Sequence, residues 1–81
     1  MSIKTLLRTP VEIYRDEKKI LRTKAGVQES IIYFNDVDVR QLDIIKVIPT
    51  KDEFEVINRP HKQIHPRTNK ILYIKAKVRR S

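Results

Sequence analysis

Two apolar runs separated by a short polar stretch constrain this chain more than any other feature of its sequence. The first run covers residues 42–49 and ends at Pro49, and the second covers residues 54–57. Both are rich in β-branched or aromatic side chains, which fit the pleated surface of a sheet. Residues 50–53 between them are polar and contain no Asn-Gly or Asp-Gly pair, which predicts a four- or five-residue connection built on a type I turn. The sequence therefore predicts a β-hairpin on which further strands pack.

The segments around this hairpin also read as strands. Residues 11–15, 20–29 and 71–80 alternate between apolar and polar side chains, and in the last of them we expect the core to receive Leu72, Ile74, Ala76 and Val78. The unbroken apolar run 31–34 predicts a strand buried on both faces. Gly26 is the only glycine, and inside a strand it predicts a bulge or a close backbone approach. About six short strands predict an all-β fold, a small antiparallel barrel or sandwich.

The chain is long enough for one domain. Its 81 residues divide into an N-terminal arm, residues 1–9, and a single β domain, residues 10–81. The arm has the spacing of a short helical turn, and Pro10 pushes the residue before it away from helical geometry. There is no cysteine and no apolar run of about 20 residues, so we expect no disulfide, no membrane span and a cytoplasmic protein.

The net charge of +8 is concentrated in the last quarter of the chain. Residues 1–58 hold ten basic and ten acidic side chains, whereas residues 59–81 hold eight basic side chains and no acid. A segregated block of one sign attracts polyanions or an acidic protein surface. The alternative interpretation is a solvated strand face followed by a basic tail that keeps the protein soluble.

The last strand gives the most specific prediction of a binding site. Alternation directs Tyr73, Lys75, Lys77 and Arg79 outward in one row, at spacings of about 7 Å, and Arg80 follows. Such a row can hold the phosphates of a nucleic acid or an acidic partner. The alternative is an edge strand whose cations prevent aggregation with other sheets.

The segment 58–70 contains two prolines and one apolar side chain, which predicts a long loop that is either functional or mobile. Its expected contacts with a partner are made by Arg59, His61, Lys62, His65, Arg67 and Lys70. The two histidines lack the further ligands that zinc requires, so we expect no metal site. The aspartates at 36, 38 and 43 lack the EF-hand glycine and closing glutamate, so they are assigned to turns. No serine has a neighbouring base, and no glycine-rich phosphate loop exists, so we expect neither an enzyme nor a cofactor.

Three segments carry a resemblance to a known family. They are Asp43-Ile44-Ile45, Phe54-Glu55-Val56-Ile57, and the strand from Leu72 to Arg80. Residues 31–80 thereby resemble the C-terminal half of small phage and prophage β-barrel proteins that join head to tail. In that family, the D-I-I strand enters the barrel, the second strand returns after a turn, and the last strand closes the barrel. Leu42 stands where the family pattern usually has a glycine.

Three functions follow as alternatives. The resemblance implies a non-enzymatic assembly component, in the cytoplasm or built into a virion, that forms a homo-oligomer or binds a protein partner. In the second alternative, the basic strand binds DNA or RNA directly. The third is an inhibitor of a nucleic-acid enzyme, although such inhibitors usually present acidic surfaces.

Overall fold

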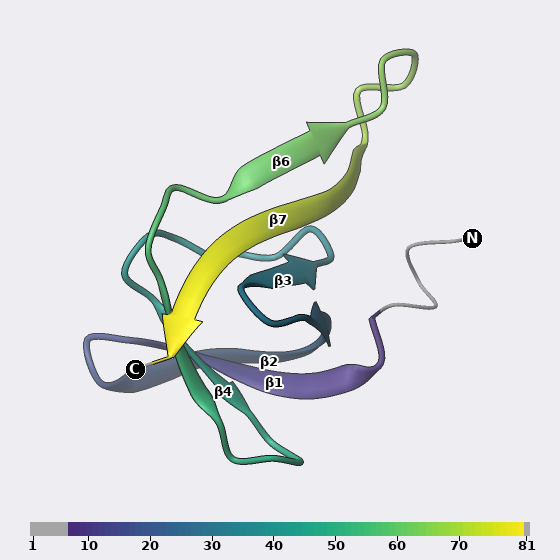
Figure 1. The fold of residues 1–81 in the computed structure, drawn as a ribbon. Helices are drawn as coiled ribbons and strands as arrows, with labels where there is room; N and C mark the ends of the chain where they lie inside the picture. Colours follow the sequence, from purple (N-terminus) through teal and green to yellow (C-terminus); the bar gives the residue numbers. More distant parts are fainter. Residues whose placement is uncertain (1–6, 81) are drawn as a thin grey trace.

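The structure is a computed structural model that describes residues 7–80, which form seven β-strands and no helix. The strands are β1 (Thr9–Arg15), β2 (Lys18–Val27), β3 (Ile31–Phe34), β4 (Ile44–Val47), β5 (Glu53–Val56), β6 (His61–Ile64) and β7 (Ile71–Arg80). All pairings are antiparallel, in the order β3-β2-β1-β4-β5-β7-β6, and an additional pairing of β3 with β7 closes the sheet (Figure 1). The predicted small antiparallel barrel of about six strands is confirmed: six strands form the barrel, and β6 is added to it.

The predicted hairpin is β4–β5, and its two strands pair from Ile44 opposite Glu55 to Lys46 opposite Glu53. Residues 48–52 connect the strands, which is the predicted length. The N–H of Lys51 donates to the carbonyl of Val47 over 2.8 Å, and Lys51 has a φ of 61°. This left-handed residue turns the chain back so that the two strands stay in register.

The core fills the barrel with side chains from alternating positions. It is formed by Val11, Ile13, Ala25, Ile32, Phe34, Val39, Ile45, Val47, Phe54, Val56, Ile74, Ala76 and Val78. The inward positions predicted for Ile74, Ala76 and Val78 are confirmed, because each is at most 2% exposed. The predicted helical turn of the arm lies mostly outside the described residues, although Leu7 is buried.

Leu72 departs from the predicted alternation. It is 44% exposed, whereas its neighbour Ile71 packs against the core. The cause is an irregularity in the β6–β7 ladder: Gln63 pairs with Tyr73 and Ile64 pairs with Ile71, so Leu72 is the extra residue of a bulge. The inward position predicted for Leu72 is therefore wrong.

Strand β3 is buried on one face, not on both. Ile32 and Phe34 are fully buried, whereas Ile31 and Tyr33 are half-buried. The outer face is covered only in part, because the ring of Tyr33 meets that of Tyr73 edge to face, with centroids 5.6 Å apart.

Gly26 lies in regular register opposite Tyr33, so the first of the two alternatives predicted there, a bulge, is wrong. The bulge of β2 lies at Ile20 instead, because Ile13 pairs with Leu21 and Tyr14 with Lys19.

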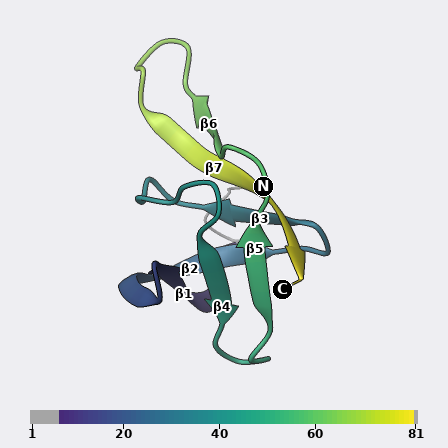
Figure 2. The same cartoon turned by 90° about the vertical axis from the view of Figure 1, so that its left-hand side faces the viewer.

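The segment predicted as a long loop, residues 58–70, contains the short strand β6. Together with β7 it forms a hairpin that projects from the barrel, visible in two views (Figures 1 and 2). We call this element, residues 59–75, the β6–β7 hairpin. All four side chains of β6 are exposed, so apolar patterning could not indicate a strand here.

Candidate functional site

The outer face of β7 receives cations and aromatic rings through its pairing with β3 and β6. Lys75 lies opposite Tyr33 on one side and opposite His61 on the other, and Lys77 lies opposite Ile31. Directly paired residues of an antiparallel sheet share a face. The predicted outward positions of Lys75 and Lys77 are confirmed, since both side chains are exposed. Three strands therefore build one surface that the sequence assigned to a single strand.

A groove of about 420 Å³ opens on this face. It is lined by Ile31, Asn58, Arg59, His61, Lys75 and Lys77. We call it the basic groove. Its lining contains no carboxylate, and within residues 7–80 none of its three cations forms a salt bridge. An amide, an imidazole and three cations around an apolar floor are suited to binding an anion.

Tyr73 packs against a second aromatic ring on the outer face of β7. It is half-buried, and its ring packs edge to face on Tyr33 at an angle of 72° between the ring planes. Tyr73 therefore packs against the surface next to the basic groove, through its contact with Tyr33. The second ring of the pair, Tyr33, was missed because only the β3–β7 register places it there.

Arg79 and Arg80 lie at the other end of β7 and are held by acidic neighbours. Arg79 donates from Nε and Nη2 to Oε1 of Glu55, at 3.2 and 2.9 Å. Arg80 lies 3.7 Å from Asp52, and its guanidinium carbon is 5.9 Å from the centroid of the Phe54 ring. Arg80 continues the inward series of Ile74, Ala76 and Val78, but its side chain is exposed. Of the cations predicted on the last strand, Arg79 and Arg80 are therefore paired with acidic side chains, whereas Lys75 and Lys77 form no salt bridge within residues 7–80.

The residues predicted as partner contacts divide between two faces of the β6–β7 hairpin. His61 and Arg59 line the basic groove, whereas Lys62 lies opposite the inward residue Ile74 and therefore faces the other way. There Lys62 contributes to a second hollow of about 540 Å³, lined also by Asp38, Val39, Arg40, Gln41, Arg59 and Pro60.

His65 orders the tip of the hairpin. Its Nδ1 accepts hydrogen bonds from the backbone N–H groups of Arg67 and Thr68, at 3.2 and 3.4 Å. The side chains of Arg67 and Lys70 are exposed at this tip. The structure thus brings together Arg59, His61, Lys75 and Lys77, and leaves Arg67 and Lys70 apart from them.

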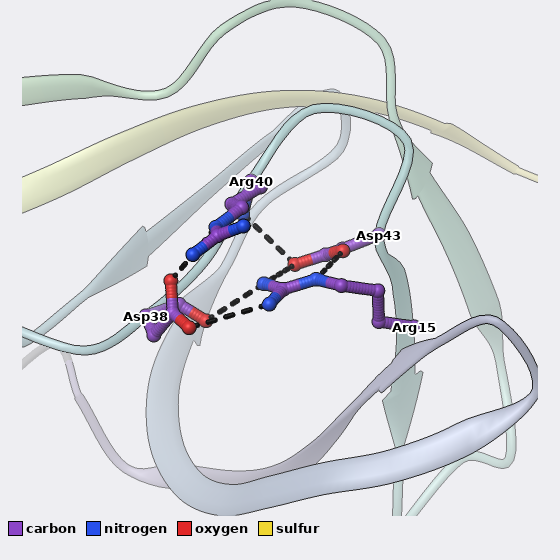
Figure 3. A network of polar contacts seen from close by, with 4 residues as sticks. All are labelled: Arg15, Asp38, Arg40 and Asp43. Atoms are coloured by element: carbon purple, nitrogen blue, oxygen red, sulfur yellow. Dashed lines mark hydrogen bonds and ion pairs between the residues drawn. The ribbon is translucent and has the colours of Figure 1, made fainter.

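An ionic network around one buried carboxylate, Asp43 in the loop before β4, was not predicted (Figure 3). Asp43 is 2% exposed and accepts hydrogen bonds from Nε and Nη2 of Arg15, at 2.9 and 2.8 Å, and from the N–H of Arg40 at 2.8 Å. Arg15 also reaches Asp38 at 3.3 Å. These contacts fix the loop before β4 onto β1, which is a structural function. The turn predicted at Asp43 does exist, since the Arg40 contact closes it, but the partner from β1 is 28 residues away.

Charge shifts within this network follow from the same contacts. The hydrogen bond to Asp43 raises the pKa of Arg15 above its ordinary value, with a smaller contribution from Asp38. The hydrogen bond from Arg15 lowers the pKa of Asp38, which Arg40 lowers further. Both shifts favour the charged forms of Arg15 and Asp38, as expected for two opposite charges in contact.

The described residues contain neither a metal-binding cluster nor a membrane-spanning helix. Between Leu7 and Arg80 there is no group of three His, Asp or Glu side chains placed to hold a metal ion. The same part of the chain has no helix with the length and apolarity needed to cross a membrane.

Comparisons of the chain with protein-family models, with curated proteins and with solved structures find no match.

Proposed function

We propose that this chain is a non-enzymatic assembly module, a component of the kind that joins head and tail in phage or prophage particles. The observation that carries the proposal is the β6–β7 hairpin. It projects from a closed barrel, all side chains of β6 are exposed, and Ile64 and Leu72 are 48% and 44% exposed. A projecting element with exposed apolar side chains is typical of a surface that another protein covers.

The positions of the three segments that resemble the head–tail joining proteins support this proposal. Strand β4 begins at Ile44, directly after Asp43, and enters the barrel. Strand β5 returns after the turn, and β7 closes the barrel by pairing with β3 and β5. These are the roles that the resemblance implies for the three segments.

The test is the oligomeric state of the protein, alone and mixed with the proteins encoded beside it, measured by light scattering after size-exclusion chromatography. We expect a defined oligomer or a stoichiometric complex. The double variant Ile64→Ser/Leu72→Ser should weaken it, whereas Ile20→Ser, at another exposed apolar position in β2, should not. A strictly monomeric protein that binds none of these proteins at high concentration would contradict the proposal.

A second candidate function, nucleic-acid binding, is favoured by the basic groove. Arg59, Lys75 and Lys77 have no acidic partner there, whereas Arg79 and Arg80 are engaged by Glu55 and Asp52. We therefore expect about three phosphates to be neutralised, which gives a slope of log affinity against log salt of about −2 to −3.

Fluorescence anisotropy with single- and double-stranded DNA at several salt concentrations measures this slope. The double variant Lys75→Ala/Lys77→Ala should reduce its magnitude by about 1.5. The matched control is Lys18→Ala/Lys24→Ala, which removes two exposed lysines from β2. Equal slopes for the two double variants would assign the effect to overall charge and would remove the groove from the interpretation.

A further inference from the structure

The outer edge of β6 is an open sheet edge. In the part of the chain that the structure describes, every strand except β6 pairs on both of its edges over at least part of its length, because the barrel is closed. Strand β6 pairs with β7 alone. Figures 1 and 2 both show β6 on the outside of the molecule, with no other strand beyond it. An open edge is a template for one more strand.

The direction of the free backbone groups of β6 follows from two hydrogen bonds at the tip of the hairpin. The N–H of His65 donates to the carbonyl of Lys70, and the carbonyl of His65 accepts from the N–H of Asn69, so both groups of His65 point toward the returning chain. Backbone groups alternate in direction along a strand. Those of Gln63 and His61 therefore face β7, and those of Lys62 and Ile64 face outward.

The chemistry around this edge selects the strand that can pair there. The β6–β7 hairpin carries Arg59, Lys62, Arg67, Lys70 and Lys75 and no acid. A second copy of this chain would bring the same cations to the edge, and like charges facing each other across a strand pair are unfavourable. A strand with acidic side chains is favoured instead.

The hollow beside Lys62 strengthens this choice. It has three cations, Arg40, Arg59 and Lys62, in its lining. Its one carboxylate, Asp38, is already engaged by Arg15 at 3.3 Å and by Arg40 at 3.2 Å. Because successive side chains of a strand alternate between faces, a strand added to β6 directs some of its side chains toward this hollow. An acidic side chain of that strand meets the positive charges of Arg59 and Lys62, which form no salt bridge within residues 7–80.

We propose that the outer edge of β6 binds an extended, acidic segment of a partner protein by strand addition, with backbone hydrogen bonds to Lys62 and Ile64. This inference rests on the proposed assembly function and names the partner's chemistry. Main-chain pairing supplies affinity in this mode of recognition, and the side chains beside the edge supply specificity.

The first test needs no substitution. The probe is a short peptide of alternating glutamate and threonine, titrated into the isotopically labelled protein and followed by NMR. We expect the amides of Lys62 and Ile64 to shift and to become protected from hydrogen exchange, while the amides of Gln63 and His61, already bonded to β7, change little. A peptide with lysine in place of glutamate should not bind. Absence of any shift with the acidic peptide would overturn the proposal.

The second test removes one outward N–H. Lys62→Pro lacks this donor, and proline is tolerated at the free side of an edge strand. The control is Lys62→Ala, which loses the same charge but keeps the N–H. We expect Lys62→Pro to bind the acidic peptide about tenfold more weakly than Lys62→Ala. Equal binding by the two variants, with both shown to be folded by circular dichroism, would rule out pairing at this edge.

The outcomes also separate this inference from the assembly function. If the protein forms a defined complex that Lys62→Pro leaves intact, the assembly function holds and pairing at the β6 edge is wrong. If the protein instead associates with itself through this edge, and Lys62→Pro abolishes that association, a second copy replaces the acidic segment and the proposal is overturned. If no complex forms at all, the assembly function itself fails, whatever the peptide does.

Discussion

The ionic network around Asp43 and the β6–β7 hairpin are both rich in charge, but the charges are paired in the first and unpaired in the second. In the network, a carboxylate that is 2% exposed receives three hydrogen bonds, two of them from Arg15. In the hairpin, the cations are exposed and form no salt bridge within the described residues. Buried charge is tolerated only when it is paired, whereas unpaired surface charge remains available to another molecule. The charges around Asp43 therefore stabilise the fold, whereas those of the hairpin form no salt bridge within residues 7–80.

Removing the buried carboxylate should have the largest effect on stability. In Asp43→Ala, the guanidinium of Arg15 loses its main partner and the N–H of Arg40 loses its acceptor. We expect the free energy of unfolding to fall by about 3 kcal/mol, measured by urea denaturation. The control is Asp36→Ala, at an exposed turn position, which should change it by less than about 0.5 kcal/mol. Similar losses of stability in the two variants would show that Asp43 does not anchor the loop before β4 onto β1.

The contact between Asp43 and Arg15 could not be predicted from the sequence, although much of the fold could. The hairpin β4–β5 and the inward side chains of β7 were predictable, because their apolar patterning is local and follows the period of a strand. The pairing of Asp43 with Arg15 spans 28 residues and depends on the β1–β4 register. No local pattern encodes that register, so Asp43 read only as a turn residue.

The candidate site was predictable to a similar extent. The alternation of the last strand placed Lys75 and Lys77 outward, and composition showed that no acid lies nearby in the sequence. Alternation could not show that Glu55 would take up Arg79, since cross-strand partners come from the topology. Strand β6 was missed because it has no buried face, and its pairing rests on backbone hydrogen bonds that any side chain permits.

The two ends of β7 show the same difference between paired and unpaired charge. Arg79 forms a salt bridge with Glu55, whereas Lys75 forms none within the described residues. A double-mutant cycle on Arg79 and Glu55, with each replaced by Ala alone and together, should give a coupling of about 0.5 kcal/mol because the pair is exposed. The same cycle on Lys75 and Glu55 should give none. A coupling for the second pair as large as that for the first would mean that Lys75 is not free to bind a ligand.

The exposed apolar side chains of the hairpin should matter even less for stability. Ile64→Ser/Leu72→Ser should change the free energy of unfolding by less than about 0.5 kcal/mol, because neither side chain belongs to the core. Ile74→Ala, two residues further along β7 in a fully buried position, should cost about 3 kcal/mol. Urea denaturation of both variants compares them directly. A large loss from the serine variant would assign the two residues to folding and would remove them from the proposed interface.

The smallest effect is expected on the loss of folding stability at acidic pH. The pKa of Asp38 lies below its ordinary value of 3.8 in the folded protein, chiefly because of the hydrogen bond from Arg15. A carboxyl group with a depressed folded pKa stabilises the protein above its unfolded pKa, and this contribution is lost as the pH falls through the folded pKa. Asp38→Asn should therefore flatten the loss of stability in acid, while Asp36→Asn should leave it unchanged. Thermal unfolding between about pH 5 and pH 2 measures the difference. If Asp38→Asn keeps the acid dependence of the parent protein, Asp38 does not contribute to stability. The stabilising contacts of the ionic network are then those among Arg15, Asp43 and the backbone of Arg40.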